Sequence, residues 1–255
     1  MKILTDPSAI EAIKKSKNIA VLTGAGISVE SGIPTFRGEN GLWTKLSPEE
    51  LASFESFYQN TAVVMEWYKY CQEIIWKCEP NPGHYALAEL SYLSGHFDLI
   101  TQNIDGLHQR AGSRDIIELH GNLLENYCMR CGQRYSIDEF DEIFKDAKDH
   151  IPRCHCGGLI RPDVVWFGET LPKENLEMAY GAAIHADVFL SIGTSGQVRP
   201  AADLPVLAKQ SGAFLIEINT QKTVLSGESD LILQGNSSEI LPQLVEDIKT
   251  LLPKA

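Results

Sequence analysis

Four cysteines form two close pairs whose spacing suits a metal ion. Cys128 and Cys131 form a Cys-x2-Cys pattern, while Cys154 and Cys156 flank His155. Each pair can occupy a tight turn and offer two sulfurs to one tetrahedral ion. A redox dithiol or isolated buried thiols are the alternatives, and His155 could replace one ligand, but two pairs across a polar segment favour zinc. Four thiolates close the coordination shell, so we predict one structural zinc ion that stabilises a small insertion.

A glycine-rich segment could hold the phosphates of a nucleotide. Gly24, Ala25 and Gly26 directly follow the apolar run 19–23, and Ser28 comes soon after. Glycines let a backbone approach a pyrophosphate closely, and free N–H groups at a helix start meet its negative charge. The segment lacks the third glycine of the usual dinucleotide fingerprint, and the glycines could serve the backbone alone. The continuation through Pro34, Thr35, Phe36 and Arg37 predicts a loop that closes over a charged ligand.

Other polar residues follow apolar runs further along the chain. Gln102, Asn103, Ile104, Asp105 and Gly106 come after residues 97–101 and bring an amide and a carboxylate, although Asn103 or Asp105 could instead cap a helix. His120 ends the run 116–119, and its neutral imidazole could act as a general base near pH 7. A structural histidine is the alternative at that position.

Three further segments could contact a nucleoside. Gly193, Thr194 and Ser195 can hydrogen-bond a ribose or phosphate and leave room for adenine, or they can form an ordinary loop. Glu217 and Asn219 stand where a ribose diol would find polar partners, and Ser237 is a weaker candidate for a contact with adenine.

The elements that must position these residues alternate between strands and helices. The apolar runs are residues 18–23, 97–102, 116–119, 188–192, 214–218 and 231–233. Near-continuous apolar strands separated by helices predict an α/β fold with a mostly parallel sheet covered on both faces. The polar residues named above lie just past the strand ends, where open α/β sheets bind ligands.

Two stretches interrupt the alternation. Residues 44–95 read as helices over 48–54, 61–76 and 83–93, and residues 126–158 carry the cysteine pairs around a charged segment, 138–150. We predict that both insertions pack into a small second domain, while residues 1–43, 96–125 and 159–255 form the nucleotide-binding domain. A helix that Asp6 caps is expected at the N-terminus, and an amphipathic helix is expected over 239–252.

Composition excludes some classes of protein. The chain has 255 residues, with 22 Lys and Arg against 34 Asp and Glu, for a net charge of −12. An acidic surface disfavours general binding to nucleic acid. We see no signal-peptide pattern and no apolar run of membrane-spanning length, so we expect a cytoplasmic protein with no membrane partner. We also expect a monomer with no nucleic-acid partner.

Seven segments together resemble one family. GAGIS, GIPTFRG, QNID, LHGN, the four cysteines, RPDVVWFGE and GTS occur in the order typical of a sirtuin, over nearly the whole chain. The resemblance implies an NAD-dependent protein-lysine deacylase with a Rossmann-like domain and a small domain made of a zinc-binding module and a helical module. Its partner would be an acylated lysine in a protein or peptide, paired as a strand near residues 165–168 and 196–198.

The resemblance also implies a role for individual residues. His120 would be the general base, and Asn103 and Asp105 would hold the nicotinamide carboxamide. The implied cofactor-binding set is Gly24, Ala25, Gly26, Ile27, Ser28, Phe36, Arg37, Trp43, Gln102, Asn103, Ile104, Asp105, Gly193, Thr194, Ser195, Asn219 and Ser237. The implied substrate-binding set is Ala52, Tyr68, Cys71, Val165, Trp166, Phe167, Gly168 and Val198.

The implied reaction joins the acyl group to the sugar of NAD. Its products are nicotinamide, free lysine and 2′-O-acyl-ADP-ribose. A mono-ADP-ribosyltransferase would use the same NAD site, and retention of His120 favours deacylation. A non-catalytic NAD-binding regulator and a zinc-ribbon nucleic-acid adaptor fit the sequence less well.

Within the family, GIPTFRG and residues 50–70 resemble the class III branch, which reads acidic acyl groups with a Tyr-x-x-Arg pair. Tyr68 matches the tyrosine, but Cys71 occupies the arginine position. A carboxylate in an apolar pocket needs a charge-assisted partner, which a thiol cannot supply. We therefore predict acetyl or other neutral acyl groups rather than succinyl. Lys69 would point away from the pocket, and small Ala52 would leave room for longer chains.

Overall fold

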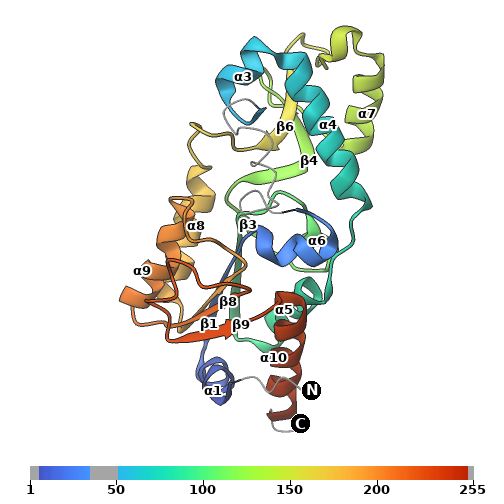
Figure 1. Ribbon diagram of the computed structural model, residues 1–255. Helices are drawn as coiled ribbons and strands as arrows, with labels where there is room; N and C mark the ends of the chain where they lie inside the picture. The colour runs from blue at the N-terminus through green and yellow to red at the C-terminus, as the bar shows by residue number, and fades with distance from the viewer. Residues whose placement is uncertain (1–5, 35–50, 252–255) are drawn as a thin grey trace.

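The computed structural model describes residues 6–34 and 51–251. Its main feature is a parallel sheet of six strands in the order β3-β2-β1-β7-β8-β9 (Figure 1). The strands are β1 (Asn18–Thr23), β2 (His96–Thr101), β3 (Ile117–Glu118), β7 (Val188–Ile192), β8 (Phe214–Asn219) and β9 (Leu231–Gln234). All six coincide with the apolar runs of the sequence, which confirms the predicted α/β fold.

Helices cover both faces of this sheet because each buried strand sends alternate side chains to opposite sides. Ile19 and Val21 of β1 pack with α1 (Pro7–Lys15), α5 (Pro82–Leu93) and α10 (Ser237–Leu251). Ala20 and Leu22, which alternate with them, pack with α8 (Lys173–His185) and α9 (Leu204–Gln210). Figure 1 shows α8 and α9 on one side of the sheet and α5 and α10 on the other.

The first helix begins where a cap predicts it. The Asp6 side chain accepts a hydrogen bond from the Ser8 N–H, and Pro7 occupies the first turn.

Two short 3-10 helices lie in loops of this part of the fold: η1 (Ala25–Ser31) follows β1, and η4 (Ala201–Asp203) precedes α9.

A second sheet and several helices form the upper part of the molecule in Figure 1. Its strands, in the order β5-β4-β6, are antiparallel: β5 (Arg134–Tyr135), β4 (Gly121–Cys128) and β6 (Ile160–Val164). The helices near it are α3 (Phe54–Gln59), α4 (Thr61–Lys77), α7 (Ile137–Asp146) and η3 (Lys148–His150). Side chains from α3, α4, β4, β6 and α7 share one apolar cluster.

Two boundaries differ from the prediction. Residues 48–50 of the expected helix over 48–54 lie outside the described residues, and within the described part α3 begins only at Phe54, after its N-cap Ser53. We assigned α5 to the helical insertion, but Ala86, Leu87 and Leu90 of α5 pack into the core beneath the large sheet, against α10. The apolar face of α5 is therefore buried with the large sheet and not in the apolar cluster that α3 and α4 share.

The strand order creates a crevice between β1 and β7. From β1 the chain proceeds to β2 on one side, and β7 later pairs on the other side of β1. Connections leave the carboxyl ends of these two strands in opposite directions, and ligands of open α/β sheets bind at such a point. No helix in the described part of the chain is long and apolar enough to cross a membrane.

Candidate active-site cleft

A cleft of about 1130 Å³ opens at the carboxyl ends of β1, β2, β7 and β8 and continues toward α4 and the segment after β6. It brings together most of the residues predicted from the sequence. Those that line it are Gly24, Ala25, Gly26, Ala52, Tyr68, Cys71, Gln102, Asn103, Ile104, His120, Val165, Trp166, Phe167, Gly168, Gly193, Thr194, Ser195, Val198, Asn219 and Ser237.

Glycines at the floor of the cleft allow two loops to touch. The Gly26 N–H donates to the Gly193 carbonyl oxygen at 2.8 Å. A Cβ on Gly26 would stand 2.6 Å from the Gly193 Cα, and one on Gly193 would stand 2.6 Å from the Ile27 nitrogen. No side chain fits at either position without moving backbone. The glycine-rich segment therefore lies directly against the loop after β7, at the switch in strand order.

His120 stands at the middle of the cleft with one ring nitrogen already bonded. Its Nδ1 lies 2.9 Å from the Gln102 carbonyl oxygen, which can only accept a hydrogen bond. Nδ1 therefore carries the proton, and Nε2 is left as an acceptor. Burial lowers the pKa of His120, although the Gln102 carbonyl opposes that shift. The ring is thus neutral at physiological pH, with Nε2 as its acceptor atom.

A polar network lies next to His120, beneath the cleft surface. The Ser28 hydroxyl donates to Asp105 Oδ2 at 2.7 Å, and the Asn103 amide donates to the Gly24 carbonyl oxygen at 3.2 Å. Burial raises the pKa of Asp105, and the Leu107 N–H and the Ser28 hydroxyl oppose that shift. Asp105 also accepts from the Leu107 N–H at 2.9 Å, so the helix-capping role considered from the sequence is present as well.

Three predicted cofactor residues lie below the surface of the cleft. Ile27, Ser28 and Asp105 are buried and do not line the cleft as the described residues define it. The Ser28 hydroxyl accepts a hydrogen bond from the Asn103 amide at 3.3 Å, and Asn103 does line the cleft. A strand-end position brought all of them to the same region, but the depth of each side chain depends on packing that the sequence does not show.

Hydrogen bonds connect cleft residues at the ends of three strands, β2, β7 and β8. The Gln102 amide donates to the Thr194 hydroxyl at 3.0 Å, and the Asn219 amide donates to the Thr194 carbonyl oxygen at 2.9 Å. Arg199, which pairs with Asp203, and Lys222 also line the cleft. A positive charge at Lys222 favours a ligand that carries phosphates.

The prediction for Glu217 is wrong. Its carboxylate is buried and accepts hydrogen bonds from the hydroxyls of Thr223 and Ser226, each at 2.5 Å. It therefore stabilises the loop after β8 and does not face the cleft. Ser237 begins α10 at the edge of the cleft, and its buried hydroxyl has no hydrogen-bond partner among the described residues.

The far end of the cleft is apolar and meets the segment after β6. The Val165 N–H donates to the His120 carbonyl oxygen at 2.9 Å, and the Phe167 N–H donates to the Ala52 carbonyl oxygen at 2.8 Å. Tyr68 is buried, with its ring 6.2 Å from that of Trp166. Burial raises the pKa of the Cys71 thiol to about 12, so this side chain is neutral. Lys69 pairs with Asp141 of α7, away from the cleft, as expected.

Three predicted residues lie outside the described part of the chain. They are Phe36, Arg37 and Trp43, so the predicted closing loop stays a prediction.

Two groups of functional interest escaped the sequence reasoning. Arg161, which is buried, and Glu169, which is partly buried, form an ion pair inside the run RPDVVWFGE. His84 and His108 stack with ring centroids 4.9 Å apart, and His84 Nε2 lies 3.4 Å from the Ser28 hydroxyl. The charge pattern in RPDVVWFGE could have indicated the first pair, but no sequence pattern indicated the second.

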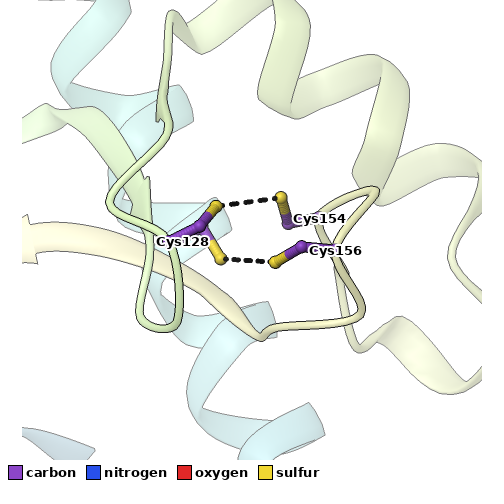
Figure 2. A group of neighbouring side chains, drawn as sticks. Cys128, Cys154 and Cys156 are labelled. Atoms are coloured by element: carbon purple, nitrogen blue, oxygen red, sulfur yellow. Dashed lines mark hydrogen bonds between the residues drawn. The ribbon is translucent and has the colours of Figure 1, made fainter.

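The four predicted zinc ligands converge in the upper part of the molecule. The sulfurs of Cys128, Cys131, Cys154 and Cys156 all lie within 4.8 Å of one another. Cys128 and Cys156 are 3.6 Å apart, as are Cys131 and Cys154. Figure 2 shows the side chains of Cys128, Cys154 and Cys156 turned toward a common centre.

Local backbone contacts favour the thiolate form at Cys154. The Cys156 N–H holds the pKa of the Cys154 thiol at about 6, which favours the thiolate that zinc binds. A Cβ on Gly158 would stand 2.7 Å from the Cys128 sulfur, so only glycine lets the second turn approach the first. The four residues fit one tetrahedral zinc ion with a closed shell.

The fold and the cleft define a nucleotide-binding α/β protein with a zinc module. The family model described as Sir2 family matches residues 24–200, and the chain belongs to this family, the sirtuins. It is 48% identical over 240 residues to NAD-dependent protein deacylase 2 of Pyrobaculum aerophilum, which covers 94% of each chain. It is 46% identical over 241 residues to the NAD-dependent protein deacylase of Pyrococcus abyssi, with 94% of this chain and 96% of that protein covered.

Two solved structures match the fold of this chain over nearly its whole length. A complex of a Sir2 homologue with NAD has a TM-score of 0.88 at 42% identity, over 96% of this chain and 94% of that one. A complex of Sir2 with a p53 peptide and NAD⁺ has a TM-score of 0.85 at 34% identity, over 96% of this chain and 98% of that one.

Proposed function

We propose that this chain is an NAD-dependent protein-lysine deacylase that acts on acetyl and other neutral acyl groups. The observation that carries the proposal is the position of His120. Its base nitrogen is set by the Gln102 carbonyl, and its own carbonyl holds the segment on which an acylated peptide would bind. One residue therefore connects the NAD side of the cleft to the peptide side.

Different residues of the cleft would bind different parts of NAD. Gly24–Gly26 and Gly193 bring backbone close to the NAD phosphates, and Lys222 adds positive charge nearby. Asn103, oriented through the Gly24 carbonyl and Ser28, would meet the nicotinamide carboxamide. Thr194 and Asn219 would meet the adenosine half, and Ser237 offers a hydroxyl without a protein partner at its edge.

When bound, NAD supplies a ribose carbon that becomes electrophilic as nicotinamide departs. His120 Nε2 accepts a proton from a hydroxyl of that ribose, which prepares the hydroxyl oxygen to take the acyl group. Trp166 and Tyr68 form a buried apolar wall that limits access of water to the acyl-lysine. One water molecule is consumed when the lysine amine is released, and the products are nicotinamide, 2′-O-acyl-ADP-ribose and free lysine.

The zinc ion has no part in bond-making. Cys128, Cys131, Cys154 and Cys156 would hold it with no open coordination position, and it would stabilise the small domain. We propose that this domain comprises residues 126–158 with α3 and α4, while residues 1–43, 96–125 and 159–255, together with α5, form the NAD-binding domain. Cytoplasmic location and a monomeric state stay predictions.

One assay separates deacylation from mono-ADP-ribosyl transfer, which would use the same NAD site. The protein is incubated with NAD and a panel of acyl-lysine peptides, and the peptide products are identified by mass. Deacylation removes the mass of the acyl group from the peptide, and ADP-ribosyl transfer adds the mass of ADP-ribose to it. Peptides that gain ADP-ribose and keep their acyl group would contradict the proposal.

A further inference from the structure

Arg161 and Glu169 form a two-point ion pair under the segment 165–168. Arg161 lies on β6 and is 1% exposed. Its two terminal nitrogens donate to the two carboxylate oxygens of Glu169 at 2.7 and 3.0 Å. A fork of this kind fixes orientation as well as distance, because both oxygens and both nitrogens are engaged.

Both partners also bind the backbone of the segment between them. The second terminal nitrogen of Arg161 donates to the Val164 carbonyl oxygen at 2.7 Å. Glu169 accepts from the Trp166 N–H at 2.8 Å through its side chain, and its own N–H donates to the Trp166 carbonyl oxygen at 3.0 Å. The pair thus closes a turn from both ends, with Gly168 at a φ of 87° inside it.

The same guanidinium also fixes the Trp166 ring. The Arg161 Cζ lies 3.3 Å from the ring centroid, and Trp166 is 2% exposed. Phe57 packs against the same ring with centroids 4.8 Å apart, and Tyr68 lies 6.2 Å away. A cation placed over an indole face is held electrostatically as well as by packing. Trp166 therefore has little freedom to leave the wall of the cleft.

Residues 165–168 are hydrogen-bonded both to the predicted base, His120, and to the segment before α3. Its Val165 N–H bonds the carbonyl of His120, and its Phe167 N–H bonds the carbonyl of Ala52 beside α3. Movement of the turn would therefore disturb both the peptide-binding edge and its attachment to the base. Neither Arg161 nor Glu169 has to touch the reacting atoms for this to matter.

We propose that Arg161 and Glu169 are positioning residues for the acylated peptide. They hold residues 165–168 in the turn that presents its edge to the peptide, and they hold Trp166 against the acyl-lysine. The proposal rests on the proposed function insofar as a peptide binds along this segment. The NAD side of the cleft, which is built on the ends of β1, β7 and β8, does not depend on the pair.

The test compares Glu169→Gln and Arg161→Lys with the wild-type protein. Glu169→Gln keeps the size of the side chain and removes its charge, and Arg161→Lys keeps the charge and removes the fork. The matched control is Arg134→Gln, which removes the exposed ion pair between Arg134 and Asp163, two residues from Arg161 on β6. Hydrogen exchange of the amides at 165–167 and steady-state kinetics are measured for each variant.

In Glu169→Gln we expect the Trp166 and Phe167 amides to exchange about tenfold faster or more. The KM for an acetyl-lysine peptide should rise about tenfold, while the KM for NAD stays within about twofold. Arg161→Lys should change the same quantities in the same direction, and Arg134→Gln should change none of them. If one variant fails to fold, the other still gives the comparison.

Two results would overturn the proposal. Amide exchange and peptide KM could match those of the wild type, or the KM for NAD could rise as much as that for the peptide, which indicates general destabilisation. If the wild-type protein turned over no acyl peptide, the proposed function would fail. Hydrogen exchange would still decide whether Arg161 and Glu169 hold the segment.

Discussion

The Nδ1 atom of His120 lies 2.9 Å from the carbonyl oxygen of Gln102, and this contact fixes the tautomer of the ring. Gln102 also donates its side-chain amide to Thr194, so its position is set by β2 and by the loop after β7 together. The base is thereby tied to the NAD site through one residue. Its orientation does not have to be established by the substrate.

Replacement of His120 should abolish deacylation without unfolding the protein. We expect His120→Ala to lose at least about 100-fold in kcat, since general-base catalysis contributes that much or more. NAD affinity and the melting temperature should stay near wild-type values, because the described contacts of the ring are with one carbonyl. His185→Ala, an exposed histidine on α8, is the control. Full activity in His120→Ala would contradict the assigned role.

The pH profile of kcat/KM should show a base with a lowered pKa. Burial lowers the pKa of His120 from the ordinary value of 6.5, and only the neutral ring can accept a proton. Activity should therefore rise with pH through a midpoint below 6.5 and be level above it. The measurement is kcat/KM for a saturable acetyl-lysine peptide between pH 5 and pH 8. An acid limb centred above 6.5 would contradict the burial argument.

The buried histidines predict a loss of stability in mild acid. Burial lowers the pKa of His84 to about 4, and it lowers the pKa of His108 well below 6.5, with His84 adding to that shift. The unfolded chain therefore binds more protons than the folded chain below pH 6.5. Stability is fully present above 6.5 and falls as pH drops toward 4, by about 1.4 kcal/mol per pH unit for each histidine.

The measurement is the free energy of unfolding from pH 7 to pH 4.5. Asp105, whose pKa burial raises, faces the same network and opposes this trend where it takes up a proton in the folded chain. A His84→Gln variant should show a shallower slope between pH 6.5 and 5 than the wild-type protein. Equal slopes would mean that His84 is not buried in its neutral form.

Removal of zinc should destabilise the small domain. We expect one zinc ion per chain by elemental analysis, and a lower melting temperature after chelation or in Cys128→Ser. Cys78→Ser, a change at a cysteine outside the cluster, should leave the metal content unchanged. A melting temperature that is indifferent to both chelation and Cys128→Ser would reject the structural zinc.

Acyl specificity should follow the charge at position 71. The buried neutral thiol of Cys71 gives no partner to a carboxylate, so acetyl-lysine should be preferred over succinyl-lysine. Cys71→Arg should raise the succinyl-to-acetyl ratio of kcat/KM about tenfold or more. Glu73→Gln changes the charge of the same helix equally but lies on its exposed side, toward Lys69. An unchanged ratio in Cys71→Arg would mean that the acyl pocket lies elsewhere.

Strand positions were predictable because buried parallel strands are apolar throughout. The runs at 18–23 and 188–192 coincide with β1 and β7 at both ends. The layer to which a helix belongs was less predictable, as α5 demonstrates. Its apolar residues indicate a buried face, but a periodic pattern does not say which neighbour buries it.

The candidate site was predictable to the level of strand ends and no further. His120, Asn103 and Thr194 line the cleft because the carboxyl ends of parallel strands meet there. Glu217 stands two residues before Asn219 in the same strand, so alternation alone would place both on one face. Its carboxylate is instead bound by the hydroxyls of Thr223 and Ser226 in the following loop, which the strand pattern does not show. Arg161 and Glu169 are paired by the turn between them, which no single residue in the run reveals.

The most direct measurement is the ratio of nicotinamide released to lysine freed by the wild-type protein with NAD and an acetyl-lysine peptide. NAD-dependent deacylation in this cleft predicts equal amounts of the two, together with 2′-O-acetyl-ADP-ribose, and no nicotinamide when the acylated peptide is left out. Lysine freed without nicotinamide, or no release of either product, would contradict the proposed function.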